Sequence, residues 1–427
     1  MRPGAQLVVG LSGGIDSVTL LAALAELAGP LQFSLGAVHV HHGISPHAAD
    51  WVQFCERLCR RLQVPLQIEK VNLDEHRALG LEGAARHARY EIFASIDADF
   101  IVLAHHRDDQ VETLLLQLLR GAGPLGMAGM PALRALAGSR ARILRPLLDL
   151  ARSDIEAWAR DRGLEWIEDE SNEDLARQRN FIRHSVLPLL EQQYPAVRTT
   201  VARSSRHLAE AGELLSVLGQ MDIDALGGAA GFDVEKLLQL GAARGRNALR
   251  FLCRSRGIRF PTEAQADELY RQLVEARCDR VMHVDIHGWR FHRYRARLCI
   301  ERVRAAVSAD FRAVWRGEPA LPLLDLGGVL RFKSEEGRGL SAQRLRQAEV
   351  SVRVRSGGEH LQPDRKRPRR TLKNLLHERG IPPWQRECRP LLYCGDHLVS
   401  VPGIGDECDW QAGPGEPGLI VSWEPLE

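Results

Sequence analysis

Hydrophobic residues follow two alternating patterns along the first 150 positions. Short apolar runs predict strands at residues 7–9, 33–41, 66–71, 100–104 and 142–144. Between them, apolar residues recur every three to four positions, which predicts helices at residues 16–27, 47–62, 82–96 and 108–119. Strands that alternate with helices are typical of an α/β domain, in which helices cover both faces of a parallel sheet.

The pattern changes at Tyr194-Pro195, where we expect the first domain to end. Residues 196–280 have mostly helical spacing, and residues 281–300 predict a β-hairpin. Residues 301–340 resemble a linker with weak strands, and a small α+β module follows from residue 352. We therefore expect an α/β domain at 1–194, a mostly helical domain with a hairpin at 195–305, a linker at 306–345 and an α+β domain at 346–427.

The composition is that of an ordinary globular protein, with 44% hydrophobic and 26% charged residues among 427. No apolar run approaches the ~18 residues of a membrane span, and the N-terminus has no signal-peptide pattern. We therefore expect a cytoplasmic enzyme with no membrane segment. The eight cysteines form no Cys-x-x-Cys pair, which favours reduced, buried thiols over a zinc or iron–sulfur site.

A glycine-rich stretch lies between the first predicted strand and the first predicted helix. It consists of Ser12, Gly13, Gly14, Ile15, Asp16 and Ser17. A helix that begins directly after such a turn points its free N–H groups and the positive end of its dipole outward, which suits phosphate. An ordinary turn with a serine or aspartate cap is the alternative. Two serines, two glycines and an aspartate within six residues favour phosphate.

Two further clusters follow predicted strands. They should face the same crevice, because ligands of such sheets lie beyond the carboxyl ends of the strands. The first cluster contains His39, and the second contains His105 and Asp109; we assign both histidines to nucleotide binding. For His39, which lies close to His41 and His42, the alternatives are packing and a metal site, and the lack of a nearby acid or thiol disfavours the metal. Glu112 lies one helical turn after Asp109, so the two carboxylates could hold Mg²⁺, bind an ammonium group or accept a proton. Acids that only satisfy the helix dipole are the alternative.

Two pairs of arginines accompany these clusters. Arg86 and Arg89 share a face of one predicted helix, and Arg179 and Arg183 begin another. Each could bind phosphate or carboxylate, or lie on the surface as a solvated cation. The glycine-rich residues 120–130 predict a mobile flap over the crevice, with a plain connection as the alternative.

Basic residues gather in the later domains although the net charge is only +2. Residues 341–380 contain eleven Lys or Arg against four Asp or Glu, and the densest block includes Arg365 and Lys366. In the predicted hairpin, Arg290 and Arg293 are interleaved with aromatic residues. Arginine beside aromatic rings suits RNA backbones and unstacked bases, whereas a strand with one wet face is the alternative.

The glycine-rich motif lacks the Gly-Lys-Ser/Thr of a Walker P-loop and resembles the PP-loop of N-type ATP pyrophosphatases, which cleave ATP to AMP and pyrophosphate. Other stretches resemble the tRNA(Ile)-lysidine synthetase family. In the N-terminal domain these are residues 38–43, 82–90, 104–113, 120–130 and 179–183. In the C-terminal domain they are the Gly-Gly-Glu, Leu-Lys-Asn-Leu, Ile-Pro-Pro-Trp, Pro-Leu-Leu-Tyr and Val-Pro-Gly-Ile-Gly motifs of residues 353–405. The chain departs from the family pattern at His41 and in its Arg/Lys-Arg-Pro run.

The resemblance implies a reaction at the wobble cytidine of the isoleucine tRNA with a CAU anticodon. ATP would adenylate the C2 oxygen, and the ε-amine of free L-lysine would displace AMP to form lysidine, which changes codon specificity from AUG to AUA. Residues 12–17 would hold the phosphates, with Asp16 near them as the Mg²⁺ ligand. The catalytic residues would be Asp16, Arg89, Asp109 and Glu112.

The resemblance also implies the substrate contacts. The carboxylates of Asp109 and Glu112 would receive the lysine or deprotonate its amine. Arginines would neutralise phosphate or carboxylate charge, and basic residues of the hairpin and the C-terminal domain would hold the tRNA. These substrate-binding residues are Arg86, Arg179, Arg183, Arg290, Arg293, Arg365, Lys366 and Lys373. The assembly state stays open, with a homodimer as one option.

Three other functions remain to be compared. A tRNA 2-thiolation enzyme would be expected to show paired cysteines at the site, and a glutamine-dependent synthetase would need an amidotransferase domain; the chain shows neither pattern. A non-catalytic RNA-binding protein with a degenerate nucleotide fold would have no need of an intact set of Ser12, Asp16 and Ser17 beside two carboxylates.

Overall fold

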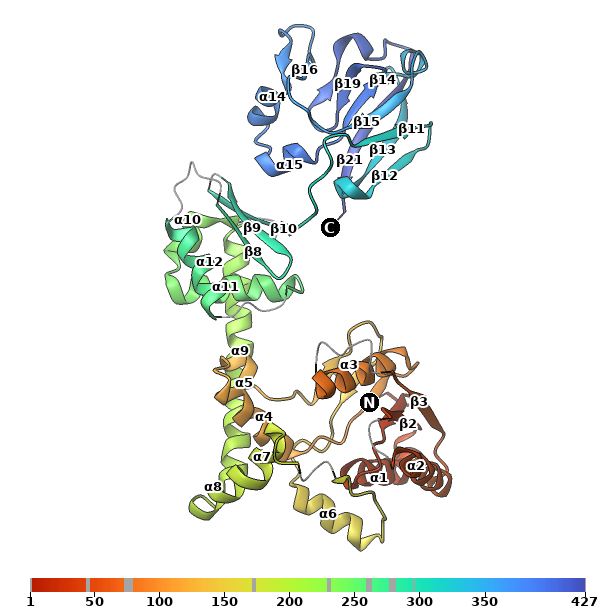
Figure 1. The fold of residues 1–427 in the computed structure, drawn as a ribbon, viewed down its shortest axis with the longest axis vertical. Helices are drawn as coiled ribbons and strands as arrows, with labels where there is room; N and C mark the ends of the chain where they lie inside the picture. Colours follow the sequence, from red (N-terminus) through yellow and green to blue (C-terminus); the bar gives the residue numbers. More distant parts are fainter. Residues whose placement is uncertain are drawn as a thin grey trace. The chain divides into compact units, whose positions relative to one another are not determined.

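The computed structural model describes residues 2–43, 47–72, 80–170, 174–228, 232–258, 263–275, 282–294 and 296–426. The chain forms two compact units, Met1–Leu218 and Gly219–Glu427 (Figure 1). Cysteines within the described ranges are free thiols, as expected, and Cys278 lies outside them. Within the same ranges, no helix is long and apolar enough to cross a membrane.

The first unit is built on a six-stranded sheet in the order β3-β2-β1-β4-β6-β5. Its strands are β1 (Gln6–Gly10), β2 (Ser34–His41), β3 (Leu66–Lys70), β4 (Phe100–Val102), β5 (Leu133–Ala135) and β6 (Arg142–Leu144). Every neighbouring pair is parallel except β5 with β6. The expected parallel sheet is confirmed, and the short antiparallel edge strand β5 is an addition to it.

Helices cover both faces of this sheet because successive strand residues point to opposite sides. Leu7 and Val9 pack in one core with residues of α1 (Ile15–Leu31) and α2 (Ala48–Leu62). Val8, between them, packs in a second core with Phe93 of α3 (Gly80–Ser95). The expected coverage by helices on both faces is therefore confirmed.

The strand order reverses between β1 and β4. From β1 the sheet continues to β2 and β3, and from β4 it continues to β6. Loops that leave two such strands diverge to opposite faces and leave a crevice at the carboxyl edge of the sheet. The turn after β1 leads into α1, and the segment after β4 leads into α4 (Arg107–Leu119). This topology brings residues 12–17 close to residues 105–112.

The residues expected to form a mobile flap are tied to two helices. Residues 124–127 form the short helix α5 (Pro124–Met127). The side-chain amide of Gln110 in α4 donates to Met130 O at 2.7 Å and accepts from Met130 N at 2.6 Å. Ser205 Oγ, in α9 (Val197–Ala225), donates to Met127 O at 3.4 Å. These contacts favour the alternative, a plain connection, and the mobile flap stays a prediction.

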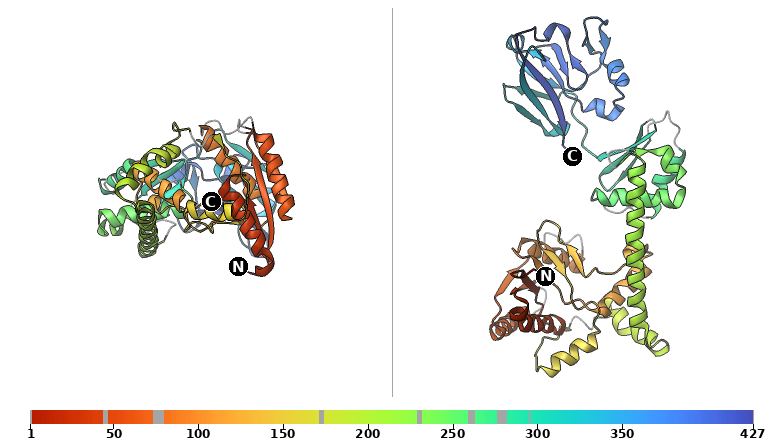
Figure 2. Two further views of the ribbon diagram at one scale, coloured as in Figure 1. Left: turned by 90° about the horizontal axis from the view of Figure 1, so that it is seen from below. Right: turned by 180° about the vertical axis from the view of Figure 1, so that it is seen from behind.

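Four more helical segments of the first unit precede α9: α6 (Arg152–Asp161), α7 (Gln178–Phe181), the π-helical turn η3 (Ile182–Val186) and α8 (Leu187–Gln193). The following helix, α9, is 29 residues long and continues past Leu218 into the second unit. Figure 2 shows it as one continuous helix. No linker therefore separates the two units in sequence.

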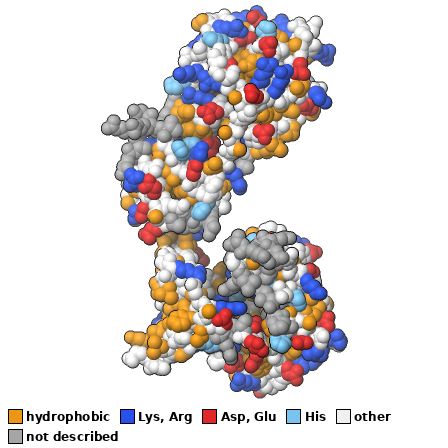
Figure 3. All heavy atoms as spheres, in the orientation of Figure 1, with side chains coloured by type: hydrophobic (Ala, Val, Ile, Leu, Met, Phe, Trp, Pro, Cys, Tyr) orange, Lys and Arg blue, Asp and Glu red, His pale blue; other side chains and the backbone are white. Residues whose placement is uncertain are grey.

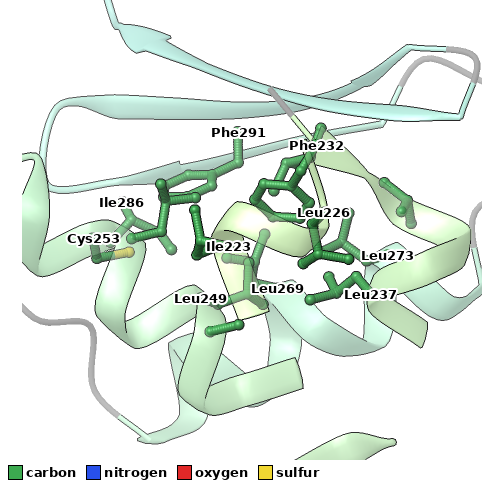
Figure 4. Close-up of a cluster of buried hydrophobic side chains, with 14 of the residues drawn as sticks. Ile223, Leu226, Phe232, Leu237, Leu249, Cys253, Leu269, Leu273, Ile286 and Phe291 are labelled. Carbon is green, nitrogen blue, oxygen red and sulfur yellow. The ribbon is translucent and has the colours of Figure 1, made fainter. Parts of the chain in front are cut away.

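The second unit begins with a helical layer against a four-stranded sheet of order β7-β10-β9-β8. The helices are α10 (Val234–Gln239), α11 (Ala242–Ser255) and α12 (Glu263–Glu275), and the strands are β7 (Phe232–Asp233), β8 (Met282–Ile286), β9 (Trp289–Tyr294) and β10 (Arg297–Arg302). Leu226, Leu249 and Phe291 belong to the buried core between helices and strands (Figure 4). The expected hairpin is confirmed as β8 and β9, but its second strand is shorter than expected: β9 ends at Tyr294 and pairs antiparallel with a further strand, β10.

The two larger sheets of the C-terminal part share one core, to which Leu330 and Val352 contribute, and β16 (His360–Leu361) and β17 (Arg370–Thr371) form a third, two-stranded sheet. One of the larger sheets consists of β11 (Arg312–Trp315), β15 (Val350–Arg353), β18 (Leu391–Cys394), β19 (His397–Val401) and β20 (Gly405–Asp406). The other consists of β12 (Ala320–Leu323), β13 (Gly328–Glu336), β21 (Pro417–Pro425) and β14 (Leu340–Ser341). The smaller elements are η4 (Leu324–Leu326), α13 (Ala342–Leu345), α14 (Leu372–Glu378), α15 (Pro383–Glu387) and η5 (Cys408–Trp410).

The segment expected to be a linker forms part of these sheets. β11 pairs with β15, and β13 pairs with β21 along nine residues. Because strands of this segment lie within both sheets, residues 312–341 belong to the C-terminal domain.

Candidate functional site

The turn between β1 and α1 requires glycine at one position. Gly13 has a φ angle of +91°, where side chains are disfavoured, and a Cβ atom there would lie 2.6 Å from Cδ1 of Ile167. Ile167 N also donates to Gly13 O at 2.9 Å. Ile15, the first residue of α1, is buried beneath the turn.

The hydroxyl of Ser17 organises the same turn. It accepts hydrogen bonds from Ser12 N and Gly13 N at 3.2 Å each, and it donates to Gly14 O at 3.0 Å. Ser12 Oγ lies 3.0 Å from Ser17 Oγ. Amide groups that converge on one oxygen at the start of a 17-residue helix form a backbone concavity that fits phosphate oxygens.

Asp16 lies at the start of α1 with 31% of its side chain exposed. Its Oδ2 atom is 3.7 Å from Nε2 of His106, and its Oδ1 atom is buried without a hydrogen-bond partner among the described residues. Mg²⁺ at nucleotide sites takes one or two carboxylates together with phosphate oxygens and water. A carboxylate with an unpaired oxygen beside a phosphate-binding turn fits that requirement. No group of three or more His, Cys, Asp or Glu within the described ranges forms a complete metal site.

Asp109 and Glu112 converge in α4, as their spacing predicts, and two arginines bind them. Glu112 is fully buried and accepts from Nε of Arg179 and from Nε of Arg183 at 2.6 Å each. Arg183 Nη2 also donates to Glu112 at 3.1 Å, and Arg179 Nη2 donates to Asp109 at 2.8 Å. The two carboxylates and the two guanidinium groups thus form one ion-pair cluster. Arg179 lies within α7, and Arg183 lies within η3.

His106 is the central residue that the sequence reasoning did not single out. Its side chain is 1% exposed, and its Nε2 atom lies 3.7 Å from Asp16 and 3.5 Å from Asp109. Its Nδ1 atom lies 3.6 Å from Asp108. Burial would lower the pKa of His106, but the surrounding carboxylates, above all Asp108 and Asp16, raise it to about 9. A histidine two residues before a pair of aspartates, in the segment that follows a strand, is the signal that could have found it.

The same charges act on the two aspartates. Burial would raise the pKa of Asp109, but the charges of His106 and Arg179 outweigh burial and hold it below its usual value. Burial opposes ionisation of Asp108 as well, but the nearby His106 together with hydrogen bonds from Arg152 N and Arg198 holds its pKa far below its usual value. Both aspartates are therefore ionised at neutral pH.

The two histidines assigned to nucleotide binding are neutral and bonded to the protein. Burial lowers the pKa of His39, whose Nδ1 atom is 2.9 Å from Leu11 O. Burial also lowers the pKa of His105 to about 4, and Arg145 donates to its Nδ1 atom at 3.2 Å. Each histidine supports the backbone or a neighbouring side chain, and its contact with a nucleotide stays a prediction.

Arg86 and Arg89 lie exposed on α3. Arg86 stacks over the ring of Tyr90 at 5.1 Å, and Arg89 Nη2 lies 3.4 Å from Nε2 of His42. Among the described residues, neither guanidinium group forms an ion pair with a carboxylate, so both remain available to an anionic ligand.

The basic residues of the hairpin are less available than their sequence pattern suggests. Arg293 is 5% exposed and donates from Nη1 to Leu273 O at 2.6 Å, so it is a structural residue and is withdrawn from the expected RNA contacts. Arg290 forms a two-point ion pair with Asp285, at 2.6 and 2.7 Å.

The basic residues of the C-terminal domain lie on its surface. Arg365, Lys366 and Lys373 are all exposed, and Lys and Arg side chains gather in several groups on the face seen in Figure 3. Within the ranges that the structure covers, no carboxylate lies within ion-pair distance of Lys366 or Lys373. These two lysines are the best placed of the predicted residues to contact a polyanion.

Comparison with known proteins assigns all three parts of the chain. Residues 2–190 match the PP-loop domain, residues 232–299 the TilS substrate binding domain and residues 350–423 the TilS substrate C-terminal domain. The tRNA(Ile)-lysidine synthase of Nitrosomonas europaea is 43% identical over 428 residues, which cover 100% of this chain and 93% of that protein. The chain belongs to the tRNA(Ile)-lysidine synthase family.

Other members of the tRNA(Ile)-lysidine synthase family match over nearly the whole chain. The one from Azoarcus sp. is 38% identical and covers 99% of this chain and 92% of its own length. The one from Aromatoleum aromaticum is 39% identical, with coverages of 99% and 98%. The resemblance seen in the sequence motifs is thereby confirmed, and the PP-loop domain indicates that ATP is used.

Proposed function

We propose that this protein forms lysidine on the isoleucine tRNA with a CAU anticodon, by ligating free L-lysine to C2 of the wobble cytidine with ATP. One observation carries the proposal. The phosphate-binding turn, Asp16 and the Asp109/Glu112 pair meet at one switch point of the sheet, in a chain that matches tRNA(Ile)-lysidine synthases over its full length.

The first step would be adenylation of the cytidine. The C2 oxygen attacks the α-phosphate of ATP, the bond between the α- and β-phosphates breaks, and pyrophosphate leaves. The backbone N–H groups of the turn at residues 12–14 would hold the phosphates, and Asp16 would hold Mg²⁺, which neutralises charge on the phosphates. Exposed Arg86 and Arg89 would add positive charge on the α3 side.

The second step would be displacement of AMP by the ε-amine of lysine. The amine bonds to C2, the C2–O bond to AMP breaks, and the amine loses a proton. With an ordinary pKa of about 10.4, only about 0.04% of lysine side chains are neutral at pH 7, so the site has to bind an ammonium group and release its proton. Asp109 and Glu112 are the carboxylates that we propose for this role.

We propose that the ion pairs around Asp109 and Glu112 require ATP to bind before lysine. While Arg179 binds Asp109, the lowered pKa of Asp109 makes this carboxylate a weak proton acceptor. Arg179 and Arg183 are 33% and 20% exposed, so part of each side chain is accessible to a ligand. We propose that they turn toward the phosphates of ATP, which frees oxygens of Asp109 and Glu112 for lysine.

A tRNA 2-thiolation enzyme would need a reactive thiol near the nucleotide. In the described part of the chain, the thiol beside the turn belongs to Cys55, and its surroundings disfavour sulfur transfer. Cys55 Sγ lies 3.5 Å from the position of a Cβ atom on Gly13 and 3.5 Å from His39 Nδ1. Burial raises the pKa of Cys55 to about 12, so this thiol stays protonated and is a poor nucleophile.

Mass measurement tests the proposed function directly. The purified protein is incubated with unmodified tRNA transcript, ATP, Mg²⁺ and lysine, and the anticodon fragment is weighed. A gain of one lysine less one water is the expected result. No gain, or exchange of oxygen for sulfur when a sulfur donor is supplied, would overturn the proposal. Asp16→Ala should abolish AMP formation while tRNA binding survives.

A further inference from the structure

Arg198 lies in the first turn of α9, where a cation is opposed by the positive end of the helix dipole. Two carboxylates stabilise it there. Its Nε and Nη2 atoms donate to the two oxygens of Glu191 at 2.5 and 3.2 Å, and its Nη1 atom donates to Oδ1 of Asp108. Glu191, in α8, therefore orients the guanidinium group of Arg198, so that its Nη1 atom faces Asp108.

Asp108 connects this arginine to His106. Its Oδ2 atom accepts from Arg152 N at 2.9 Å and lies 3.6 Å from His106 Nδ1. Both oxygens of Asp108 thus have fixed partners, which sets the plane of the carboxylate. Since Asp108 is 5% exposed, removal of Arg198 would leave a buried carboxylate whose remaining charged partner, within the described ranges, is His106.

His106 in turn faces Asp16. Its Nε2 atom lies 3.7 Å from Asp16 Oδ2, and a shift of the imidazole toward Asp108 would lengthen this separation. The Oδ1 atom of Asp16 is the buried oxygen without a partner in the described ranges. The orientation of that oxygen therefore depends on the positions of His106 and Asp108, and so on Arg198.

We infer that Arg198 is a positioning residue for Asp16, and that it acts through Asp108 and His106 to hold the Asp16 carboxylate in the orientation that binds Mg·ATP. The inference rests on the proposed function, in which Asp16 binds Mg²⁺ beside the phosphates. Arg198 does not touch Asp16 itself, and it contributes by fixing the two groups between them.

A double-mutant cycle between Arg198 and Asp16 tests this inference on the full chain. Mg·ATP affinity is measured by calorimetry without tRNA or lysine, for the wild type, Arg198→Met, Asp16→Asn and the double variant. A displacement of about 1 Å can cost up to about 100-fold, so we expect Arg198→Met to weaken affinity by about tenfold or more. The double variant should bind no more weakly than Asp16→Asn alone, because Arg198 acts only through Asp16.

Two further variants separate positioning from general stability. Arg198→Lys retains the charge beside Asp108 and should recover part of the lost affinity. Arg203→Met removes an exposed arginine from the same helix and should leave affinity unchanged. If Arg198→Met does not fold, the same double-mutant cycle is measured with Arg198→Lys, and then with Asp108→Asn, each combined with Asp16→Asn.

The outcomes distinguish this inference from the proposed function. If Asp16→Asn weakens Mg·ATP binding but Arg198→Met has no effect, or its effect adds fully to that of Asp16→Asn, the positioning role is overturned and the proposed function stands. If Asp16→Asn leaves Mg·ATP binding unchanged, the assigned role of Asp16 fails, and the positioning role fails with it.

Discussion

Arg183 forms a two-point ion pair with the fully buried carboxylate of Glu112. Its Nε atom donates to one carboxylate oxygen at 2.6 Å, and its Nη2 atom donates to the other at 3.1 Å. A lysine has one ammonium group and cannot bind both oxygens in this way. We expect Arg183→Lys to reduce AMP and lysidine formation by about 10- to 100-fold. Arg177→Lys changes a half-exposed partner of Asp174 on the same segment and should have little effect. Equal rates for both variants would contradict the assigned role of Arg183.

Glu112→Gln separates the two steps of the proposed reaction. The amide keeps the shape of the side chain but loses the charge that would bind the lysine ammonium group. We expect lysine transfer to fall at least tenfold more than adenylation, with a raised KM for lysine. The measurement compares adenylated tRNA, formed without lysine, with lysidine formed in its presence. An equal loss in both steps would show that Glu112 has no particular role toward lysine.

The two glycines of the turn should respond differently to a methyl group. Gly13→Ala places a side chain at a φ angle of +91° and against Ile167, which costs at least about 1–2 kcal/mol of stability. Gly14 has a φ angle of −74°, and a Cβ atom there meets nothing closer than 3.7 Å, so Gly14→Ala is a control for folding. Thermal unfolding should show a lower midpoint for Gly13→Ala than for Gly14→Ala, and the reverse order would refute this account of the turn.

The raised pKa of His106 predicts a loss of stability in mildly alkaline solution. An unfolded histidine has a pKa of about 6.5, whereas the folded value is about 9. The protonated imidazole therefore contributes its full stabilisation below about pH 6.5, and this contribution disappears as the pH rises through about 9. The difference corresponds to about 3 kcal/mol at most. Urea unfolding between pH 6 and 9.5 should show this decline, and His106→Gln should flatten it; an unchanged slope in the variant would assign the decline to other groups.

The exposed lysines of the C-terminal domain should contribute to tRNA binding through salt-dependent contacts. Each phosphate contact contributes about 0.7–0.9 to the slope of log affinity against log salt concentration. Replacement of both Lys366 and Lys373 by alanine should lower this slope by about 1–2. Lys333→Ala removes a lysine that lies 3.6 Å from Glu335 in the same domain and should change the slope less. If the wild type and the variant without Lys366 and Lys373 showed identical slopes, these two lysines would not contact the tRNA.

Sequence patterns predicted the parts of this structure that depend on neighbouring residues. The parallel sheet followed from apolar runs that alternate with helical spacing, and the convergence of Asp109 and Glu112 followed from one helical turn. The partners of these carboxylates are 67–74 residues away in sequence, and no local pattern reports such pairing.

Long-range strand pairing accounts for the main error in domain organisation. In the segment expected to be a linker, Gly328 of β13 pairs with Pro425 of β21, almost at the end of the described chain. A strand whose partner is so distant shows only a weak local signal, because its apolar positions are defined by the sheet that it joins. Arg293 shows the same effect on a side chain, since its acceptor lies twenty residues earlier on a helix.

The hydroxyl of Ser17 has a consequence for the kinetics of nucleotide capture. Because this oxygen already accepts from Ser12 N and Gly13 N, the amides are aligned by the fold itself. In the proposed function, an incoming phosphate oxygen would replace the hydroxyl as acceptor, and the hydroxyl would keep Gly14 O as a partner. Ordering a free loop costs about 1–2 kcal/mol per residue, and this turn avoids that cost at the moment of association. Nucleotide association with the first unit should therefore proceed without a slow conformational step, at a rate proportional to nucleotide concentration.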